Sequence, residues 1–175
     1  MAAGIYIHIP FCVRKCNYCD FFSQPVDDEN IIKSYTIALL KEIAFYGEKY
    51  GKKFEADSVF FGGGTPSLIK PSFIARIIED LRQNFDIKDD AEISMECNPA
   101  TADEEKLAAY RKAGVNRLSI GAQSFDDQVL KKLGRIHTAS DITQTIKAAR
   151  KSGFENINLD LMFAVPGLDG RKWRS

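Results

Sequence analysis

Short apolar runs alternate along the chain with longer segments in which apolar residues recur every three or four positions. Runs rich in β-branched and aromatic residues are typical of buried strands, whereas the longer spacing indicates a helix with one apolar face. The pattern predicts strands at 5–9, 57–61, 92–96, 117–121 and 156–162. It predicts helices at 27–51, 71–85, 103–113, 127–133 and 140–152. This alternation predicts an α/β fold with a parallel sheet and right-handed crossovers.

The helix predicted at 27–51 carries an apolar stripe, and we expect all of it to face the core. Its members are Ile31, Ile32, Tyr35, Leu39, Leu40, Ile43 and Tyr46.

Length and composition fit one globular domain spanning residues 1–175, since 45% of the residues are hydrophobic and 27% charged. Lys plus Arg and Asp plus Glu number 24 each, so net charge gives no reason to expect nucleic acid as a partner. No segment approaches the roughly 20 apolar residues of a membrane span, and no signal-peptide pattern is present. We therefore expect a cytoplasmic protein, in which cysteines serve as metal ligands or buried thiols rather than disulfides.

Three cysteines with the spacing C-x3-C-x2-C, namely Cys12, Cys16 and Cys19, follow the first predicted strand. Thiolates this close together favour a soft metal. A structural zinc site needs four ligands, so three cysteines point to a [4Fe–4S] cluster with one iron open to another ligand. The alternatives are a zinc ion that takes His8 or Cys97 as its fourth ligand, and three unrelated buried cysteines.

The residues around these cysteines resemble the radical SAM superfamily, whose clusters bind S-adenosylmethionine (SAM) at the open iron and cleave it reductively. Tyr-x-His-Ile-Pro-Phe-Cys (6–12) and Cys-x-Tyr-Cys-Asp-Phe (16–21) are similar to the oxygen-independent coproporphyrinogen III oxidase (HemN/HemW-like) family, most of all to its haem-chaperone branch. The resemblance implies a partial (β/α)6 barrel, truncated here after about five βα units, and covers only the N-terminal half of such proteins. Residues 168–175 are too few for a sixth unit, so we expect an open sheet edge at 156–162.

Polar residues stand where the predicted strands end, and in a parallel barrel these ends converge on one mouth. The glycine run at 62–66 lets a ligand approach the main chain, or else serves only the turn. A zwitterionic amino acid bearing a ribose needs acceptors for its ammonium, donors for its carboxylate and a carboxylate for the ribose hydroxyls. Groups of these kinds are supplied by Gly63, Gly64, Thr65, Glu96, Gln123 and Asp160.

For the methionine part of SAM, the resemblance implies that Gly63, Gly64 and Thr65 contact the amino group. Glu96 would accept hydrogen bonds from the same ammonium, and Arg135 would pair with the carboxylate. The alternative for Arg135 is a solvated loop charge.

For the adenosine part, the resemblance implies that Gln123 and Asp160 hold the ribose and that Tyr18 lies beside the adenine. A carboxylate between Leu159 and Leu161 on a buried strand is otherwise hard to explain. Tyr6 would lie near the sulfonium and the cluster.

Two histidines and one cysteine remain. Strand alternation places His8 on the same side as Tyr6, where it is either catalytic or a hydrogen-bonded core histidine. His137 follows Arg135 in a loop and is expected to be exposed. Cys97 is expected to be a small buried residue.

The resemblance implies one-electron reduction of SAM to methionine and a 5′-deoxyadenosyl radical. Oxidases of the family use this radical to decarboxylate propionates oxidatively, converting coproporphyrinogen III to protoporphyrinogen IX, and carry a further cysteine in a Cys-x-Cys pattern. This chain has Cys19-Asp20-Phe21, which favours the haem-chaperone branch. The alternatives are the oxidase activity and an inactive truncated fragment. Expected partners are haem or a porphyrinogen, a reducing electron donor, and a second copy joined through the open edge.

Overall fold

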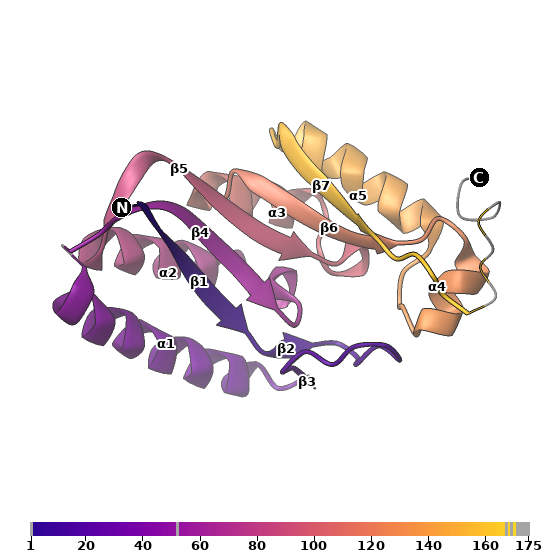
Figure 1. Ribbon diagram of the computed structural model, residues 1–175, viewed down its shortest axis with the longest axis horizontal. Helices are drawn as coiled ribbons and strands as arrows, with labels where there is room; N and C mark the ends of the chain where they lie inside the picture. The colour runs from indigo at the N-terminus through magenta and orange to yellow at the C-terminus, as the bar shows by residue number, and fades with distance from the viewer. Residues whose placement is uncertain (1, 52, 167, 169, 171–175) are drawn as a thin grey trace.

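The computed structural model describes residues 2–51, 53–166, 168 and 170. Its main sheet has five parallel strands in the order β1-β4-β5-β6-β7, which is also their order along the chain (Figure 1). The strands are β1 (Ala2–Ile9), β4 (Glu55–Gly63), β5 (Asp86–Cys97), β6 (Arg117–Gln123) and β7 (Asn156–Leu161). The predicted parallel α/β sheet is therefore confirmed.

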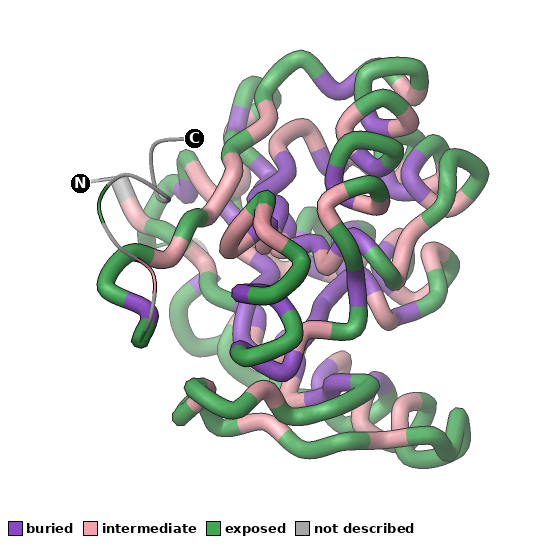
Figure 2. Tube along the Cα trace, turned by 90° about the vertical axis from the view of Figure 1, so that its right-hand side faces the viewer, coloured by how far each residue is buried: buried purple, intermediate pink, exposed green. Residues whose placement is uncertain are grey.

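One face of this sheet packs against helices and forms the core. Helices α1 (Glu29–Tyr50), α2 (Pro71–Asn84), α3 (Glu104–Ala113) and α5 (Ala139–Lys151) lie on this face, whereas α4 (Asp127–Leu133) does not. Phe61, Met95 and Ile120 point from neighbouring strands into the core and are completely buried. Figure 2 shows the buried residues gathered in the middle of the molecule. No described helix covers the opposite face of the sheet, while α4 lies beyond the carboxyl ends of the strands (Figure 1).

Capping residues explain where several helices begin and end. Asp28, Asp103 and Asp126 each accept a hydrogen bond from a backbone amide in the first turn of the following helix. Gly114 and Gly134 end α3 and α4 in the left-handed conformation, which glycine adopts without strain. These local signals account for the close agreement with the predicted helices.

Three features of the backbone escaped the sequence prediction. β5 begins at Asp86 rather than at residue 92, because backbone pairing with β4 needs no apolar side chains in the polar stretch before Ala91. The two short strands β2 (Phe11–Cys12) and β3 (Gln24–Pro25) form a separate parallel pair. Single 3-10 turns follow β4 and β5, at Pro66–Leu68 and Pro99–Thr101.

The apolar stripe predicted for α1 is only partly core. Leu39 and Ile43 are buried, but Ile31 is 46% and Tyr46 is 44% exposed, so the prediction was wrong for these two residues. Ile31 lies about 80° around the helix from Leu39, at 100° per residue, and so leaves the face that meets the sheet. Tyr46 packs instead against Tyr50, with ring centroids 6.1 Å apart.

Both edges of the five-stranded sheet are unpaired within the described residues, since β1 pairs only with β4 and β7 only with β6. The open edge predicted at 156–162 is therefore confirmed for this part of the chain. The expectation about residues 168–175 lies mostly outside the described residues. Among the described residues, no helix is both long and apolar enough to cross a membrane.

Candidate functional site: a cysteine loop beside a polar pocket

The segment that carries the three cysteines, here called the cysteine loop (residues 12–25), is closed at its base by main-chain hydrogen bonds. The amide of Gln24 donates to the carbonyl of Pro10 at 2.9 Å, and the amide of Val26 donates to the carbonyl of Cys12 at 2.9 Å. These bonds belong to the β2–β3 pair. The loop therefore begins and ends at one place, directly after β1.

The cysteine loop also binds to α4, more than 100 residues further along the chain. The Asn17 amide donates to the carbonyl of Leu133 at 3.0 Å, and its side-chain amide donates to the carbonyl of Lys132 at 2.9 Å. Gly134 follows with φ of +75°, and a Cβ there would lie 3.0 Å from the side chain of Asn17. The left-handed end of α4 therefore makes room for the loop.

The glycine run after β4 is in close contact with the same loop. The amide of Gly64 donates to the carbonyl of Ile9, and that of Thr65 to the carbonyl of Phe11, both at 2.7 Å. A Cβ on Gly64 would lie 2.6 Å from the Phe11 carbonyl oxygen and 3.0 Å from Cys12 Sγ. Glycine is required at this position because the chain's own backbone, rather than a ligand, lies so close to it.

We expect Gly64→Ala to displace Cys12 and to lower the free energy of unfolding by about 1–3 kcal/mol, because the added methyl group overlaps backbone that cannot rotate away. Urea denaturation of the apo chain measures this change. Gly170→Ala is the control, because a Cβ there would meet no atom within 4 Å. Equal stability of the two variants would contradict the expectation.

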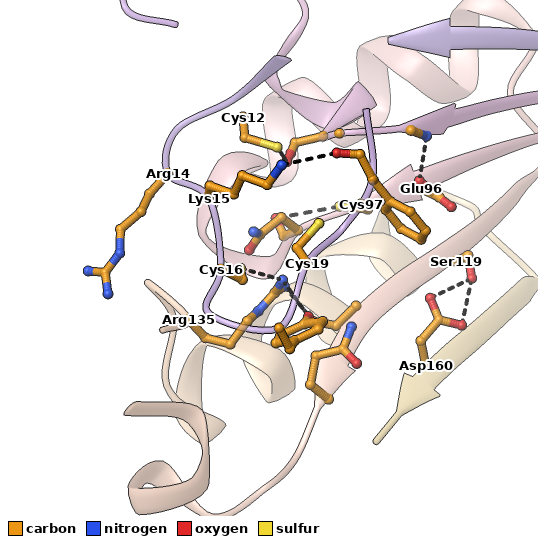
Figure 3. A pocket seen from close by; sticks show the side chains of 18 residues that line it. Cys12, Arg14, Lys15, Cys16, Cys19, Glu96, Cys97, Ser119, Arg135 and Asp160 are labelled. Atoms are coloured by element: carbon orange, nitrogen blue, oxygen red, sulfur yellow. Dashed lines mark hydrogen bonds between the residues drawn. The ribbon is translucent and has the colours of Figure 1, made fainter. Parts of the chain in front are cut away.

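The carboxyl ends of the strands and the cysteine loop enclose one pocket, shown in Figure 3. It contains all three loop cysteines and every SAM-binding residue predicted at the strand ends, within the cysteine loop and after α4. The predicted residues that line it are Cys12, Cys16, Tyr18, Cys19, Gly63, Gly64, Thr65, Glu96, Gln123, Arg135 and Asp160. The tertiary structure therefore brings together groups that are far apart in the sequence.

Glu96, at the end of β5, has an unusual carboxyl group. Burial raises its pKa to about 7, although a hydrogen bond of 3.1 Å from the Gly63 amide acts in the opposite direction. The nearby charge of Asp160 raises the pKa further. A half-buried carboxyl in this setting is poised to bind a cation, whose charge would favour ionisation.

Arg135 lies in the pocket, so its alternative reading as a solvated loop charge was wrong. One terminal nitrogen donates to the Gly121 carbonyl at 2.8 Å, and the other lies 3.6 Å from Cys16 Sγ and 3.4 Å from the Tyr18 hydroxyl. Its Nε is buried and has no hydrogen-bond partner among the described residues. A buried donor left unpaired is costly, and an anionic ligand would relieve this cost.

Asp160 is held by two neighbours that the sequence analysis did not identify. The hydroxyl of Ser119 lies 3.0 Å from both carboxylate oxygens, and the side-chain amide of Asn158 donates to one of them at 2.6 Å. Ser119 also lines the pocket. Strand alternation places Ser119 on the same face of β6 as Gly121, so the sequence pattern could have identified Ser119 as a pocket residue.

Tyr6 and His8 lie side by side, as predicted from strand alternation, but neither lines the pocket. His8 Nε2 lies 2.8 Å from the carbonyl of Phe22, which can only accept, so this nitrogen carries the proton. In neutral His8, Nδ1 then accepts a hydrogen bond of 3.0 Å from the Tyr6 hydroxyl. The pair adjoins the pocket through Gly63, since a Cβ on Gly63 would lie 2.6 Å from the His8 ring.

His137, expected to be exposed, is 3% exposed, so that prediction was wrong. Its Nε2 lies 3.2 Å from the carbonyl of Ala122, and its Nδ1 lies 3.3 Å from the side-chain oxygen of Asn98. It therefore connects the carboxyl ends of β6 and β5, next to Gln123 and Cys97. Burial lowers its pKa, and the Arg135 charge lowers it further, so the neutral form is favoured. No local sequence signal distinguishes this contact from a loop histidine on the surface.

We expect His137→Ala to lower the free energy of unfolding by about 2–4 kcal/mol, because it leaves a cavity and removes the hydrogen bonds to the Ala122 carbonyl and to the Asn98 side chain. Urea denaturation again gives the measurement. His137→Gln keeps a donor at a similar distance from the main chain and should lose less. An alanine variant as stable as the native chain would show that the buried contact contributes nothing.

Cys97 is buried, as expected, and its thiol points toward the carbonyl of Asn98 at 3.8 Å. Burial raises its pKa to about 11, which keeps it in the thiol form. All four cysteines line the pocket, but Cys16 and Cys19 are partly exposed, whereas Cys12 and Cys97 are buried.

The donor set of this pocket fits an iron–sulfur cluster and an amino-acid ligand. Cys12, Cys16 and Cys19 supply the soft sulfur ligands that such clusters take. The unpaired Nε of Arg135 and the raised pKa of Glu96 leave an anion site and a cation site next to the three thiols.

A parallel βα sheet with a cysteine loop and a polar pocket at its strand ends defines a cofactor-binding protein of the partial-barrel class. The sequence matches the model of the Radical SAM superfamily over residues 6–174, and the chain belongs to this superfamily. Membership implies a [4Fe–4S] cluster and SAM as cofactors.

Individual relatives show which members of the superfamily this chain resembles. The chain is 41% identical to "Heme chaperone HemW" of Escherichia coli (strain K12) over 163 residues, which cover 93% of this chain and 43% of that protein. It is 35% identical to "Oxygen-independent coproporphyrinogen III oxidase" of Bradyrhizobium diazoefficiens, covering 94% of this chain and 37% of that protein. The solved structure of coproporphyrinogen III oxidase (HemN) from Escherichia coli matches with a TM-score of 0.84 and 32% identity, over 91% of this chain and 37% of that one. The chain thus spans less than half the length of these relatives.

Proposed function

We propose that Cys12, Cys16 and Cys19 bind a [4Fe–4S] cluster and that the adjoining pocket binds SAM. The observation that carries this proposal is that one pocket contains the three thiols together with an unpaired arginine nitrogen and a carboxyl of raised pKa. These groups complement the carboxylate and the ammonium of an amino acid.

We propose that Arg135 binds the methionyl carboxylate and that Glu96 accepts hydrogen bonds from the methionyl ammonium beside Gly63, Gly64 and Thr65. When bound, the reduced cluster supplies the electron that divides SAM into methionine and a 5′-deoxyadenosyl radical. The protein residues orient the sulfonium for this step through the two ends of the amino acid.

At the other end of the pocket, Asp160 and Gln123 would bind the ribose hydroxyls. Ser119 and Asn158 fix the Asp160 carboxylate in advance, which reduces the entropy lost on binding. Tyr18 would lie beside the adenine. Burial raises the Tyr18 pKa, although the Arg135 charge acts against this, so the phenol stays neutral. We keep Tyr6 and His8 as the candidate catalytic pair next to the pocket.

At a finer level, we propose that this chain belongs to a haem-chaperone protein. Phe21 stands where a further cysteine is expected in the oxidases, and curated relatives include haem chaperones. The second candidate is coproporphyrinogen oxidation, favoured by the oxidase relative and by the fold match.

Further proposals are a cytoplasmic location, a reducing electron donor, and self-association through the open sheet edge.

Anaerobic reconstitution with iron and sulfide, followed by reduction in the presence of SAM, tests the cofactor proposal. We expect about four irons per chain and formation of 5′-deoxyadenosine. A chain that binds zinc rather than iron would overturn the cluster assignment. A cluster that forms without SAM cleavage would identify an inactive fragment that retains the ligands.

A further inference from the structure

The last turn of α4 is completed by the cysteine loop. The carbonyls of the last four residues of a helix have no partner within the helix itself. Backbone amides of the two residues that follow α4 donate to the first two of these carbonyls. The other two, of Lys132 and Leu133, accept hydrogen bonds from the side-chain amide and the backbone amide of Asn17, at 2.9 and 3.0 Å. Asn17 therefore caps α4 from a segment that is distant in the sequence.

The residues on either side of Asn17 contact Arg135, which follows the end of α4 by two positions. A terminal nitrogen of Arg135 lies 3.6 Å from Cys16 Sγ and 3.4 Å from the Tyr18 hydroxyl. Figure 3 shows Arg135 beside Cys16. The cysteine loop and the end of α4 thus meet through three successive loop residues, and Asn17 is the middle one.

Two sets of contacts fix the place of Arg135. On the sheet side, its guanidinium donates to the Gly121 carbonyl at 2.8 Å, and His137 lies 3.2 Å from the Ala122 carbonyl. On the loop side, the contact with the Tyr18 hydroxyl is too long to be a strong hydrogen bond. The two shorter bonds of Asn17 therefore do most to set the position of Arg135 relative to the cysteine loop.

We propose that Asn17 is a positioning residue for SAM. By capping α4, it holds the Arg135 guanidinium at a fixed place relative to Cys16. It thereby sets where the methionyl carboxylate lies with respect to the cluster. The planar guanidinium pairs with a carboxylate only when the two are aligned, so a small displacement of its backbone weakens binding. This inference rests on the proposed function, because it takes Cys16 as a cluster ligand and Arg135 as the carboxylate partner.

Asn17→Ala in the anaerobically reconstituted chain tests the proposal. We expect the iron content to stay at about four atoms per chain, because all three loop cysteines remain. The Kd for SAM, measured by calorimetric titration, should rise about tenfold. The KM for SAM should rise with it while kcat changes little, because Arg135 binds the carboxylate equally before and during the reaction. A merely structural role would instead lower the iron content and kcat.

A double-mutant cycle asks whether Asn17 acts through Arg135. In an Arg135→Ala background the carboxylate partner is already missing, so adding Asn17→Ala should change the Kd for SAM by less than about twofold. Equal weakening in the two backgrounds would overturn the proposal, because Asn17 would then act on SAM by another route.

Gly134→Ala approaches the same contact from α4. Gly134 is buried with φ of +75°, and a Cβ there would lie 3.0 Å from the side-chain oxygen of Asn17 and 3.2 Å from its backbone nitrogen. This variant should therefore also raise the Kd for SAM. Val13→Ala is the matched control, since Val13 belongs to the same loop, is 50% exposed and has no side-chain donor. It should leave the Kd unchanged, and circular dichroism verifies that each variant folds.

The native chain separates failure of this inference from failure of the proposed function. A native chain that forms no cluster, or does not bind SAM, would refute the proposed function and this inference with it. A native chain that binds SAM and forms 5′-deoxyadenosine, together with an Asn17→Ala variant of equal affinity, would refute the inference alone. Loss of iron from Asn17→Ala would also refute it, because Asn17 would then serve the cluster rather than Arg135.

Discussion

Cys16→Ser is expected to abolish the cluster, with iron falling from about four atoms per chain to near zero and 5′-deoxyadenosine formation falling more than about 100-fold. Cys16 is one of the three cysteines of the loop, and serine oxygen is a poor ligand for iron in such clusters. Its sulfur also lies 3.6 Å from the Arg135 guanidinium, so the change removes a contact between the cysteine loop and the anion site. Iron analysis and product assay after anaerobic reconstitution give the two measurements.

Cys97→Ser is the matched control for this experiment. Cys97 also lines the pocket, but its thiol is buried and stays protonated, so we expect the iron content to be unchanged. Loss of iron in both variants would show that Cys97 is a ligand and that the three-cysteine assignment is incomplete. Retention of iron in Cys16→Ser would exclude Cys16 from the cluster.

The affinity for SAM is expected to fall as the pH is lowered, by about fivefold between pH 7 and pH 6. The Glu96 carboxyl has a pKa of about 7 in the free chain, so it is increasingly protonated below that pH. An ammonium group requires the ionised carboxylate, and binding must therefore release the proton. The α-amino group of SAM itself stays largely protonated over this range. Calorimetric titration in buffers of different ionisation enthalpy measures both the affinity and the proton release.

Glu96→Gln should bind SAM weakly and without this pH dependence, while being more stable than the native chain. Because the folded chain holds the Glu96 proton more tightly than the unfolded chain, this group lowers stability as the pH rises from about 4.5 to about 7. Removing the charge should therefore add about 1–2 kcal/mol at pH 7.5, after allowance for solvent screening. A variant that keeps the native pH dependence of SAM binding would assign the released proton to another group.

Much of the fold and of the candidate site was predictable because the signals are local. Helical periodicity and aspartate caps placed the helices, and β-branched runs placed the strands that end at Gly63 and Gln123. The three cysteines form a contiguous motif, so their shared site did not depend on the fold. The expectation that strand ends converge followed from the parallel topology.

The tertiary structure decided those properties that depend on contacts between distant segments. The burial of His137, the hydrogen bonds from Ser119 to Asp160 and the docking of Asn17 on α4 all join residues that no local pattern relates. The raised pKa of Glu96 likewise depends on burial by other strands.

The sequence by itself determined the five strands of the main sheet, the helices between them and the motif that holds three cysteines together, because these follow from residues close together in the chain. Only the tertiary structure decided that Gly64 makes room for the Phe11 carbonyl, that Arg135 leaves a buried donor unpaired, and that Tyr6 and His8 lie outside the pocket. The physical reason is that free space, desolvation and unsatisfied hydrogen bonds depend on how neighbouring elements pack.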